Sequence, residues 1–218
     1  QKPVGEVHAP DIDIEPETAN KNGFHNSDVS VKLNVIDPRY AGTEPSEIGF
    51  YSGLNRITYK IYTKDTDAVE EGVLFDLRDK KDGANYDKDG LAYSWSGKIT
   101  INSNKFNSNN VIIQVTATDN AGNTRITSTL QGEIKIDVTK PRIKVEYSNN
   151  AVDSSSYFKS GRKATIIITE RNFNADDVDI HITNSNGKSP TLSKWRKING
   201  TGNKDNTKWQ ATVSYDKD

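Results

Sequence analysis

One short segment of the chain has the spacing of a metal-binding loop. Residues 85–90 (NYDKDG) place side-chain oxygens at alternate positions before a glycine, which is the first half of a calcium-binding loop. The position that should supply a bidentate carboxylate is Ser96, so the ligand on which calcium affinity depends most is missing. Asn, Asp and Gly are also the residues of tight turns. The segment favours a hairpin turn, with a calcium loop as the alternative.

Two further carboxylates flank the middle of the chain. Asp119 opens the turn DNAGN, and Asp137 precedes the segment VTKP. If these two segments met at a junction between domains, the carboxylates could share a cation such as calcium. The alternative, which we favour, is that Asp119 accepts hydrogen bonds from the turn amides of Ala121 or Gly122.

Residues for catalysis form no known constellation in this sequence. His8, His25 and His181 are far apart and belong to no HExxH motif, which predicts surface or structural roles for them. The sequence also has no GxSxG elbow, P-loop or GxGxxG motif. It has no cysteine, which excludes disulfides and thiol catalysis. We therefore expect a protein that is not an enzyme and requires no cofactor.

Aromatic residues suggest recognition of a macromolecule instead. Four of them lie in two segments rich in turn-forming residues: Tyr40, Phe50, Tyr51 and Tyr86. Aromatic side chains on loops of a rigid scaffold can bind as antibody loops do, and the alternative is that they anchor their own loops. Trp195 and Arg196 lie among cations in an irregular segment, where they could form an interface anchor, or Trp195 could pack on a sheet. Trp95 and Trp209 lie in alternating segments and are expected in a core or on a sheet face.

The composition favours an all-β scaffold in two domains. The chain has 218 residues, enough for two domains of roughly 100 residues each. Only 33% of the residues are hydrophobic, which suits half-buried strands better than helices packed on both faces of a sheet. The net charge of -1, with acids and bases interspersed, predicts no nucleic-acid binding. No apolar run approaches the roughly 18 residues of a membrane span, which predicts no membrane insertion in this segment.

Alternating apolar residues predict strands along the whole chain, with no helical periodicity. In the first part they lie at 11–15, 29–35, 57–61, around Val73 and Phe75, and at 94–101, 111–118 and 134–138. Residues 39–53 and 64–94 interrupt this pattern as long insertions, the second of which contains the strand around Phe75. Many short strands separated by turns are typical of a β-sandwich. Pro141, which cannot donate to a ladder, marks the end of this first domain.

After Pro141 the pattern begins again, which indicates a degenerate tandem repeat with domains at 1–138 and 139–218. Five segments correspond: 142–146 with 11–15, 157–161 with 23–27, 164–170 with 29–35, 178–182 with 57–61, and 208–213 with 94–99. On this alignment the second copy ends before any counterpart of VIIQVTATDNAGN. We therefore expect it to be truncated before its last two strands, which would expose core residues and open edges.

Several motifs together resemble the bacterial immunoglobulin-like repeats of Firmicutes cell-surface proteins. They are the DxAGN turn, the IDxTxP linker, the pair Tyr157-Phe158 and the sequence TERNF at 169–173. The resemblance implies two tandem immunoglobulin-like β-sandwiches, each of about seven strands when complete. It also implies an extracellular location, at the surface or cell wall of a Gram-positive bacterium or secreted from it.

The same resemblance implies a function without catalysis. Related surface proteins act as adhesins that bind a host protein or glycan, and some are superantigens that capture immunoglobulin variable domains, so an immunoglobulin is one candidate partner. The alternatives are a structural spacer and an accessory carbohydrate-binding domain of an extracellular enzyme, in which Trp195 or the loop tyrosines would stack on sugars. Some related domains also contain an intramolecular Lys-Asn isopeptide bond.

Overall fold

The structure is a computed structural model that describes residues 7–38, 40–41, 48–79, 82–148, 161–182, 190–199 and 204–215. Within these ranges the chain consists of β-strands and turns, with a single 3₁₀ turn at Ala175–Asp177 (η2) and no α-helix. The all-β expectation is therefore confirmed for the described residues. The chain divides into two compact units, residues 1–138 (unit 1) and 139–218 (unit 2), and each is described by itself.

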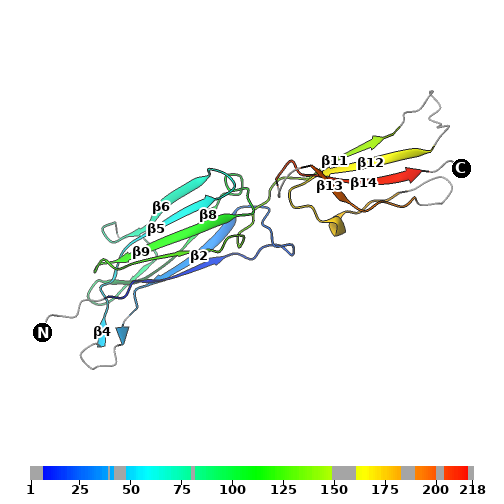
Figure 1. Ribbon diagram of the computed structural model, residues 1–218. Helices are drawn as coiled ribbons and strands as arrows, with labels where there is room; N and C mark the ends of the chain where they lie inside the picture. Colours follow the sequence, from blue (N-terminus) through cyan, green and yellow to red (C-terminus); the bar gives the residue numbers. More distant parts are fainter. Residues whose placement is uncertain are drawn as a thin grey trace. The chain divides into compact units, whose positions relative to one another are not determined.

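Unit 1 is built from two four-stranded antiparallel sheets, ordered β1-β2-β8-β7 and β10-β9-β5-β6 (Figure 1). A separate two-stranded hairpin, β3–β4, projects from one end of them (Figure 1). The strands of unit 1 in the described residues are Asp11–Pro16 (β1), Val29–Ile36 (β2), Tyr40–Ala41 (β3), Ile48–Phe50 (β4), Leu54–Thr63 (β5), Val69–Asp76 (β6), Ala84–Tyr86 (β7), Ala92–Ile101 (β8), Val111–Asp119 (β9) and Thr124–Ser128 (β10).

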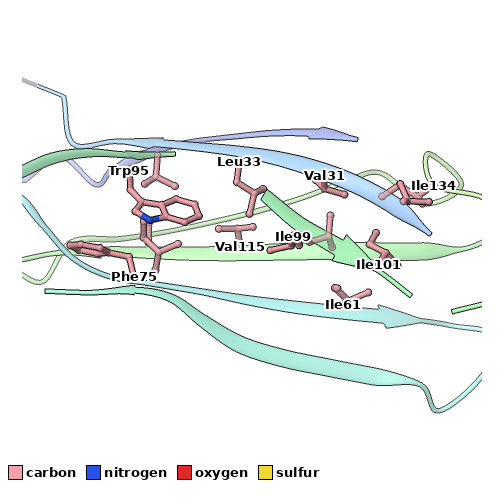
Figure 2. Packing of buried hydrophobic residues seen from close by; sticks show 14 of the residues in the cluster. Val31, Leu33, Ile61, Phe75, Trp95, Ile99, Ile101, Val115 and Ile134 are labelled. Atoms are coloured by element: carbon pink, nitrogen blue, oxygen red, sulfur yellow. The ribbon is translucent and has the colours of Figure 1, made fainter. Parts of the chain in front are cut away.

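The two sheets face each other across one hydrophobic core, because their strands alternate as the sequence predicts. In β2, Leu33 is fully buried while its neighbours Lys32 and Asn34 are exposed. Figure 2 shows the apolar side chains of β2 and β8 meeting those of β5 and β9 between the ribbons. The largest fully buried side chains of this core are Phe75, Phe106, Leu33, Leu54, Ile57, Ile61, Ile101, Ile113, Ile134 and Ile136.

Trp95 lies in this core, as expected, and a glycine makes room for its ring. Its indole Nε1 donates a hydrogen bond to the carbonyl oxygen of Asp82 at 3.1 Å, which satisfies the one polar atom of a side chain that is only 5% exposed. The ring lies against Gly97, where an added Cβ would come within 2.5 Å of ring carbons. A side chain at position 97 would therefore displace the indole.

The insertion expected at 64–94 is shorter than the sequence pattern indicated. The strand expected around Phe75 is the eight-residue β6, which pairs with β5 at seven positions. β7 pairs with β8 further along. The consecutive acids Glu70 and Glu71 and the glycine at 72 break the alternation in β6, so its first half carries no clear strand signal.

The strand expected at 134–138 is replaced by two isolated bridges. Leu130 and Glu133 close a turn after β10, since the backbone N–H of Leu130 donates to the Glu133 carboxylate at 2.7 Å. Ile134 then bridges Val111, and Ile136 forms a parallel bridge to His25. Both isoleucines are fully buried, so the alternation in the sequence reports burial correctly but not a continuous strand.

Unit 2 contains one four-stranded sheet in the order β11-β12-β14-β13, and all neighbours are antiparallel. Its strands in the described residues are Arg142–Tyr147 (β11), Arg162–Thr169 (β12), Arg196–Asn199 (β13) and Lys208–Tyr215 (β14). Residues 178–182 were expected to form a strand like β5, but they form none. Ile180 and Ile182 nevertheless pack on the apolar cluster of Ala164, Ile166 and Val213. Tyr157 and Phe158 lie outside the described residues.

Candidate functional site

Three connections of unit 1 meet at one end of the sandwich, which we call the loop end. They are the described residues 37–38, 40–41 and 48–53 between β2 and β5, residues 87–91 between β7 and β8, and residues 120–123 between β9 and β10. The strand registers bring them together, because Ile36 pairs with Ser94 in one sheet and Leu54 with Asp119 in the other.

Residues 52 and 53 join the first connection to the third. The backbone N–H of Asn120 donates to the carbonyl oxygen of Gly53 at 2.9 Å, and the Asn120 side-chain amide donates to the carbonyl oxygen of Ser52 at 2.9 Å. The backbone N–H of Ala121 donates to the Ser52 hydroxyl at 3.1 Å. Three hydrogen bonds therefore hold two loops that are almost 70 residues apart in sequence.

Gly53 also ties this junction to the end of β2. Its backbone N–H donates to a carboxylate oxygen of Asp37 at 2.7 Å, and the Asp37 side chain is almost fully buried. Gly53 has φ of +84°, in the left-handed region, and an added Cβ would lie 3.1 Å from the Cβ of Leu91 and 3.4 Å from the backbone N of Ala92. Glycine is required here both by the backbone conformation and by the close approach of β8.

Tyr51 joins the first connection to the second. Its hydroxyl donates to one carboxylate oxygen of Asp87. The other oxygen accepts the backbone N–H groups of Asp89 at 2.9 Å and Leu91 at 2.8 Å. The hairpin turn favoured for residues 85–90 is thereby confirmed, because Asp87 folds the turn between β7 and β8 with one oxygen and holds Tyr51 with the other.

Asp119 has the turn-forming role that we favoured, and its carboxylate adds a partner that was not expected, Asn123. Its side chain is fully buried. One carboxylate oxygen accepts the backbone N–H of Asn123 at 2.8 Å, and the other accepts the Asn123 side-chain amide at 2.9 Å. The expected bond to a turn amide is also present, because the backbone carbonyl oxygen of Asp119 accepts the N–H of Gly122 at 3.3 Å.

Asp119 and Asp137 do not come together, so they cannot share a cation. Asp119 ends β9, whereas Asp137 follows Ile134, which bridges Val111 at the start of that strand. The eight residue steps between the ends of β9 correspond to about 26 Å of extended chain. Within the described residues no group of three or more His, Asp or Glu side chains is arranged to hold a metal ion.

The aromatic residues expected at the binding surface divide into three groups. Tyr51 is half-buried and anchors its own loop through Asp87, as the alternative interpretation held. Tyr86, at the end of β7, is 38% exposed beside the same turn. The backbones of Tyr40 and Phe50 pair in the β3–β4 hairpin, and their side chains lie outside the described part of the structure.

Trp195 and Arg196 belong to unit 2, where Trp195 packs on other aromatic rings. The ring of Phe173 meets that of Trp195 edge to face, with centroids 5.1 Å apart, and stacks on that of Trp209 at 4.8 Å. Trp195 is half-buried and packs on other side chains, which agrees with the second interpretation given for it. Arg196 is exposed at the start of β13.

An ion pair between Arg78 and Asp76 holds the backbone where β6 ends, near the loop end. The guanidinium of Arg78 donates to both carboxylate oxygens of Asp76, at 3.0 and 2.9 Å, and the Arg78 backbone N–H donates to one of them at 3.1 Å. These bonds lower the pKa of Asp76 to about 2, so the carboxylate stays ionised throughout the physiological range.

A shallow hollow of about 430 Å³ lies on the outer face of the sheet β10-β9-β5-β6. Its lining includes Thr58, Lys60, Glu71, Gln114 and Thr116. Lys60 and Glu71 form an ion pair at 2.7 Å, so the two charges largely neutralise each other.

A scan of the sequence against protein-family models gives no match, and a search of curated proteins gives no significant match. In the part of the chain that the structure describes, no helix has the length and apolar character required to cross a membrane.

Sequence reasoning missed the residues that hold the loop end together. Asp37, Ser52 and Gly53 were recognised only as loop or turn residues. Asp37 bonds Gly53, which is 16 residues away, and Ser52 and Gly53 bond residues 120–121, which are still more distant in sequence. A weak signal was present in the glycine at position 53, directly before an alternating strand, since such a glycine often marks a close backbone approach.

Proposed function

We propose that this chain is a non-catalytic binding module of an extracellular Gram-positive bacterial surface protein, built from immunoglobulin-like repeats. In this proposal the loop end of unit 1 contacts a host macromolecule. The observation that carries the proposal is the junction at Ser52 and Gly53, which joins loops from both sheets into one surface.

The strand orders support the immunoglobulin-like assignment. With the strands of an immunoglobulin domain lettered in chain order, β1-β2-β8-β7 corresponds to A-B-E-D and β10-β9-β5-β6 to G-F-C-C′. The order β11-β12-β14-β13 in unit 2 repeats the first of these. Residues 37–53 and 120–123 then occupy the B–C and F–G positions, two of the three connections that contact antigen in antibody variable domains.

The physical character of the loop end also suits binding of a protein. A loop that is already ordered loses less conformational entropy when it binds, so more of the contact energy appears as affinity. Tyr86 is exposed beside the ordered turn at 87–91, and tyrosine supplies a large contact area with few rotatable bonds. A host protein is therefore the proposed class of partner, and the choice of an immunoglobulin rests on the sequence resemblance alone.

The carbohydrate-binding alternative receives less support. It depended on Trp195 or the loop tyrosines as platforms for sugar rings. Trp195 packs against Phe173, and Tyr51 is engaged with Asp87 through its hydroxyl. Of the candidate platforms with described side chains, Tyr86 remains exposed. A structural spacer remains the competing function, and it requires no partner.

Affinity capture from serum and mucosal secretions tests the proposal. The full chain should enrich a host protein, and Tyr86→Ala should weaken its binding at least about tenfold, as loss of an interface aromatic commonly does. Leu130→Ser is the matched control, because Leu130 is 77% exposed and lies beyond β10 at the opposite end of unit 1. Enrichment of no partner would favour the spacer, and equal effects of the two substitutions would place the contact elsewhere.

A further inference from the structure

A row of short side chains forms the floor of the hollow on the outer face of the sheet β10-β9-β5-β6. Thr58 of β5 pairs with Thr116 of β9 and with Val73 of β6, and all three line the hollow. The row faces away from the core, because neighbouring residues such as Ile57 and Val115 are fully buried. Three β-branched side chains therefore lie side by side across three strands.

Longer side chains border this row on both sides. On one side, two residues along the strands, the next row consists of Gln114, Lys60 and Glu71. On the other side lies Arg56, which also lines the hollow. Since a strand rises about 3.3 Å per residue, each border lies about 7 Å from the short row. The hollow is therefore a trough that crosses the three strands.

Arg56 gives the hollow a positive charge that is only partly balanced. Its guanidinium Nε lies 4.0 Å from a carboxylate oxygen of Asp76, and among the described residues it forms no hydrogen bond. The Asp76 carboxylate is already occupied, because Arg78 donates to both of its oxygens. Two guanidinium groups share one carboxylate, which leaves one positive charge, and the Arg56 side chain is 51% exposed. At the other border, Lys60 and Glu71 pair with each other and add no net charge.

The hollow also offers neutral hydrogen-bonding groups. Thr58, Gln114 and Thr116 are half-buried, and none of these side chains has a hydrogen-bond partner among the described residues. Hydroxyls and primary amides both donate and accept, as the hydroxyls of a sugar do.

The position of the hollow on a sheet face also restricts the ligand. The backbone of β5 is engaged in ladders with β6 and β9, so side chains must recognise a ligand bound here. An extended peptide gains affinity from backbone pairing at the edge of a sheet, which this face does not offer. The hollow therefore favours a ligand that carries many small polar groups of its own.

We propose that the hollow binds the acidic end of a glycan, a sugar that carries one carboxylate. Arg56 pairs with the carboxylate. Thr58, Thr116 and Gln114 exchange hydrogen bonds with the sugar hydroxyls. One available guanidinium matches a single carboxylate better than a phosphate group, which carries about two charges. This site requires no aromatic platform and lies on the sheet face, so its test does not depend on the protein partner proposed for the loop end.

NMR titration of the isotope-labelled full chain tests the proposal with two pairs of probes. Sialyllactose is compared with lactose, and methyl glucuronide with methyl glucoside, because only the first member of each pair carries a carboxylate. At least one acidic probe should bind with a Kd below about 1 mM and at least about tenfold more tightly than its neutral counterpart. The largest shifts should lie at 56–60 and 114–118, and the tighter acidic probe distinguishes a sialylated glycan from a uronic acid. Acidic probes that bound no more tightly than the neutral ones, or shifts confined to other strands, would overturn the proposal.

Substitutions in the full chain locate the contact. Arg56→Gln should weaken binding of the acidic probe at least about tenfold, and Thr58→Val, which removes one hydroxyl and keeps the shape, about two- to tenfold. Lys32→Gln is the matched control, because it removes one positive charge from the exposed face of the other sheet and should leave the affinity unchanged. Tyr86→Ala, which tests the loop end, should also leave it unchanged. Equal losses for Arg56→Gln and Lys32→Gln would overturn the proposal, since the attraction would then depend on overall charge.

Discussion

Replacement of Gly53 by alanine should destabilise unit 1 more than any comparable change in an open turn. Alanine in the left-handed region costs about 1–2 kcal/mol. The new Cβ would also lie 3.1 Å from the Cβ of Leu91, an atom fixed to the backbone just before β8, which cannot move aside cheaply. Together we expect a loss of about 2 kcal/mol in the free energy of unfolding, or about 6 °C in Tm for a unit of this size.

Gly122→Ala is the matched control. Gly122 has φ of +92°, yet an added Cβ would meet nothing within 4 Å. Its replacement should cost only the backbone strain, about 1 kcal/mol. Thermal unfolding of the two variants and the unchanged chain, followed by calorimetry, measures the difference. If Gly53→Ala lowered Tm no more than Gly122→Ala, Gly53 would not be held against β8 as described.

Three further outcomes follow from the structure of unit 1. Burial lowers the pKa of His25 below its usual 6.5. The neutral side chain should therefore contribute fully to stability above about pH 6.5, and this contribution should decline as the pH falls through the lowered pKa. His25→Gln should weaken this dependence of Tm on pH. Gly97→Ala should destabilise unit 1 by about 1–3 kcal/mol and shift the fluorescence of Trp95, because the new methyl group would displace the indole; an unchanged spectrum would contradict that contact. Asp119→Ala should cost about 1–3 kcal/mol, measured by urea unfolding, since the fully buried Asp119 carboxylate accepts two hydrogen bonds from Asn123; a neutral effect would show that the turn folds without the carboxylate.

The sequence predicts those strands in which every second side chain is buried. It fails where side chains alternate between buried and exposed but the backbone forms no ladder with a neighbouring strand. β2 and β9 were predictable because every second residue enters the core. Ile134 and Ile136 have the same alternation and are equally buried, but the turn before them prevents a continuous ladder. Residues 178–182 show the same separation in unit 2. Periodicity reports which side chains are buried, and a ladder also requires a neighbouring strand.

The turns and aromatic residues of the loop end could be predicted from the sequence, but the hydrogen bonds between its loops could not. The turn residues at 119–123, the hairpin at 85–90 and the tyrosines between strands were all apparent from residue types. The junction at Ser52 and Gly53 was not, because all four of its hydrogen bonds involve a backbone carbonyl or N–H group, which carries no sequence signal. Their partners are set by the strand register, which becomes known only when the sheets are assembled.

Whether the loop end is one ordered surface is tested most directly by amide hydrogen exchange in the free full chain. The decisive amides are those of Gly53, Leu91 and Asn120, which donate to Asp37, Asp87 and Gly53 respectively. We predict that the three exchange slowly and with a common opening free energy, because breaking one junction releases the loops together. Exchange at the rate of an unstructured peptide, or three unrelated opening energies, would contradict a single preformed binding surface.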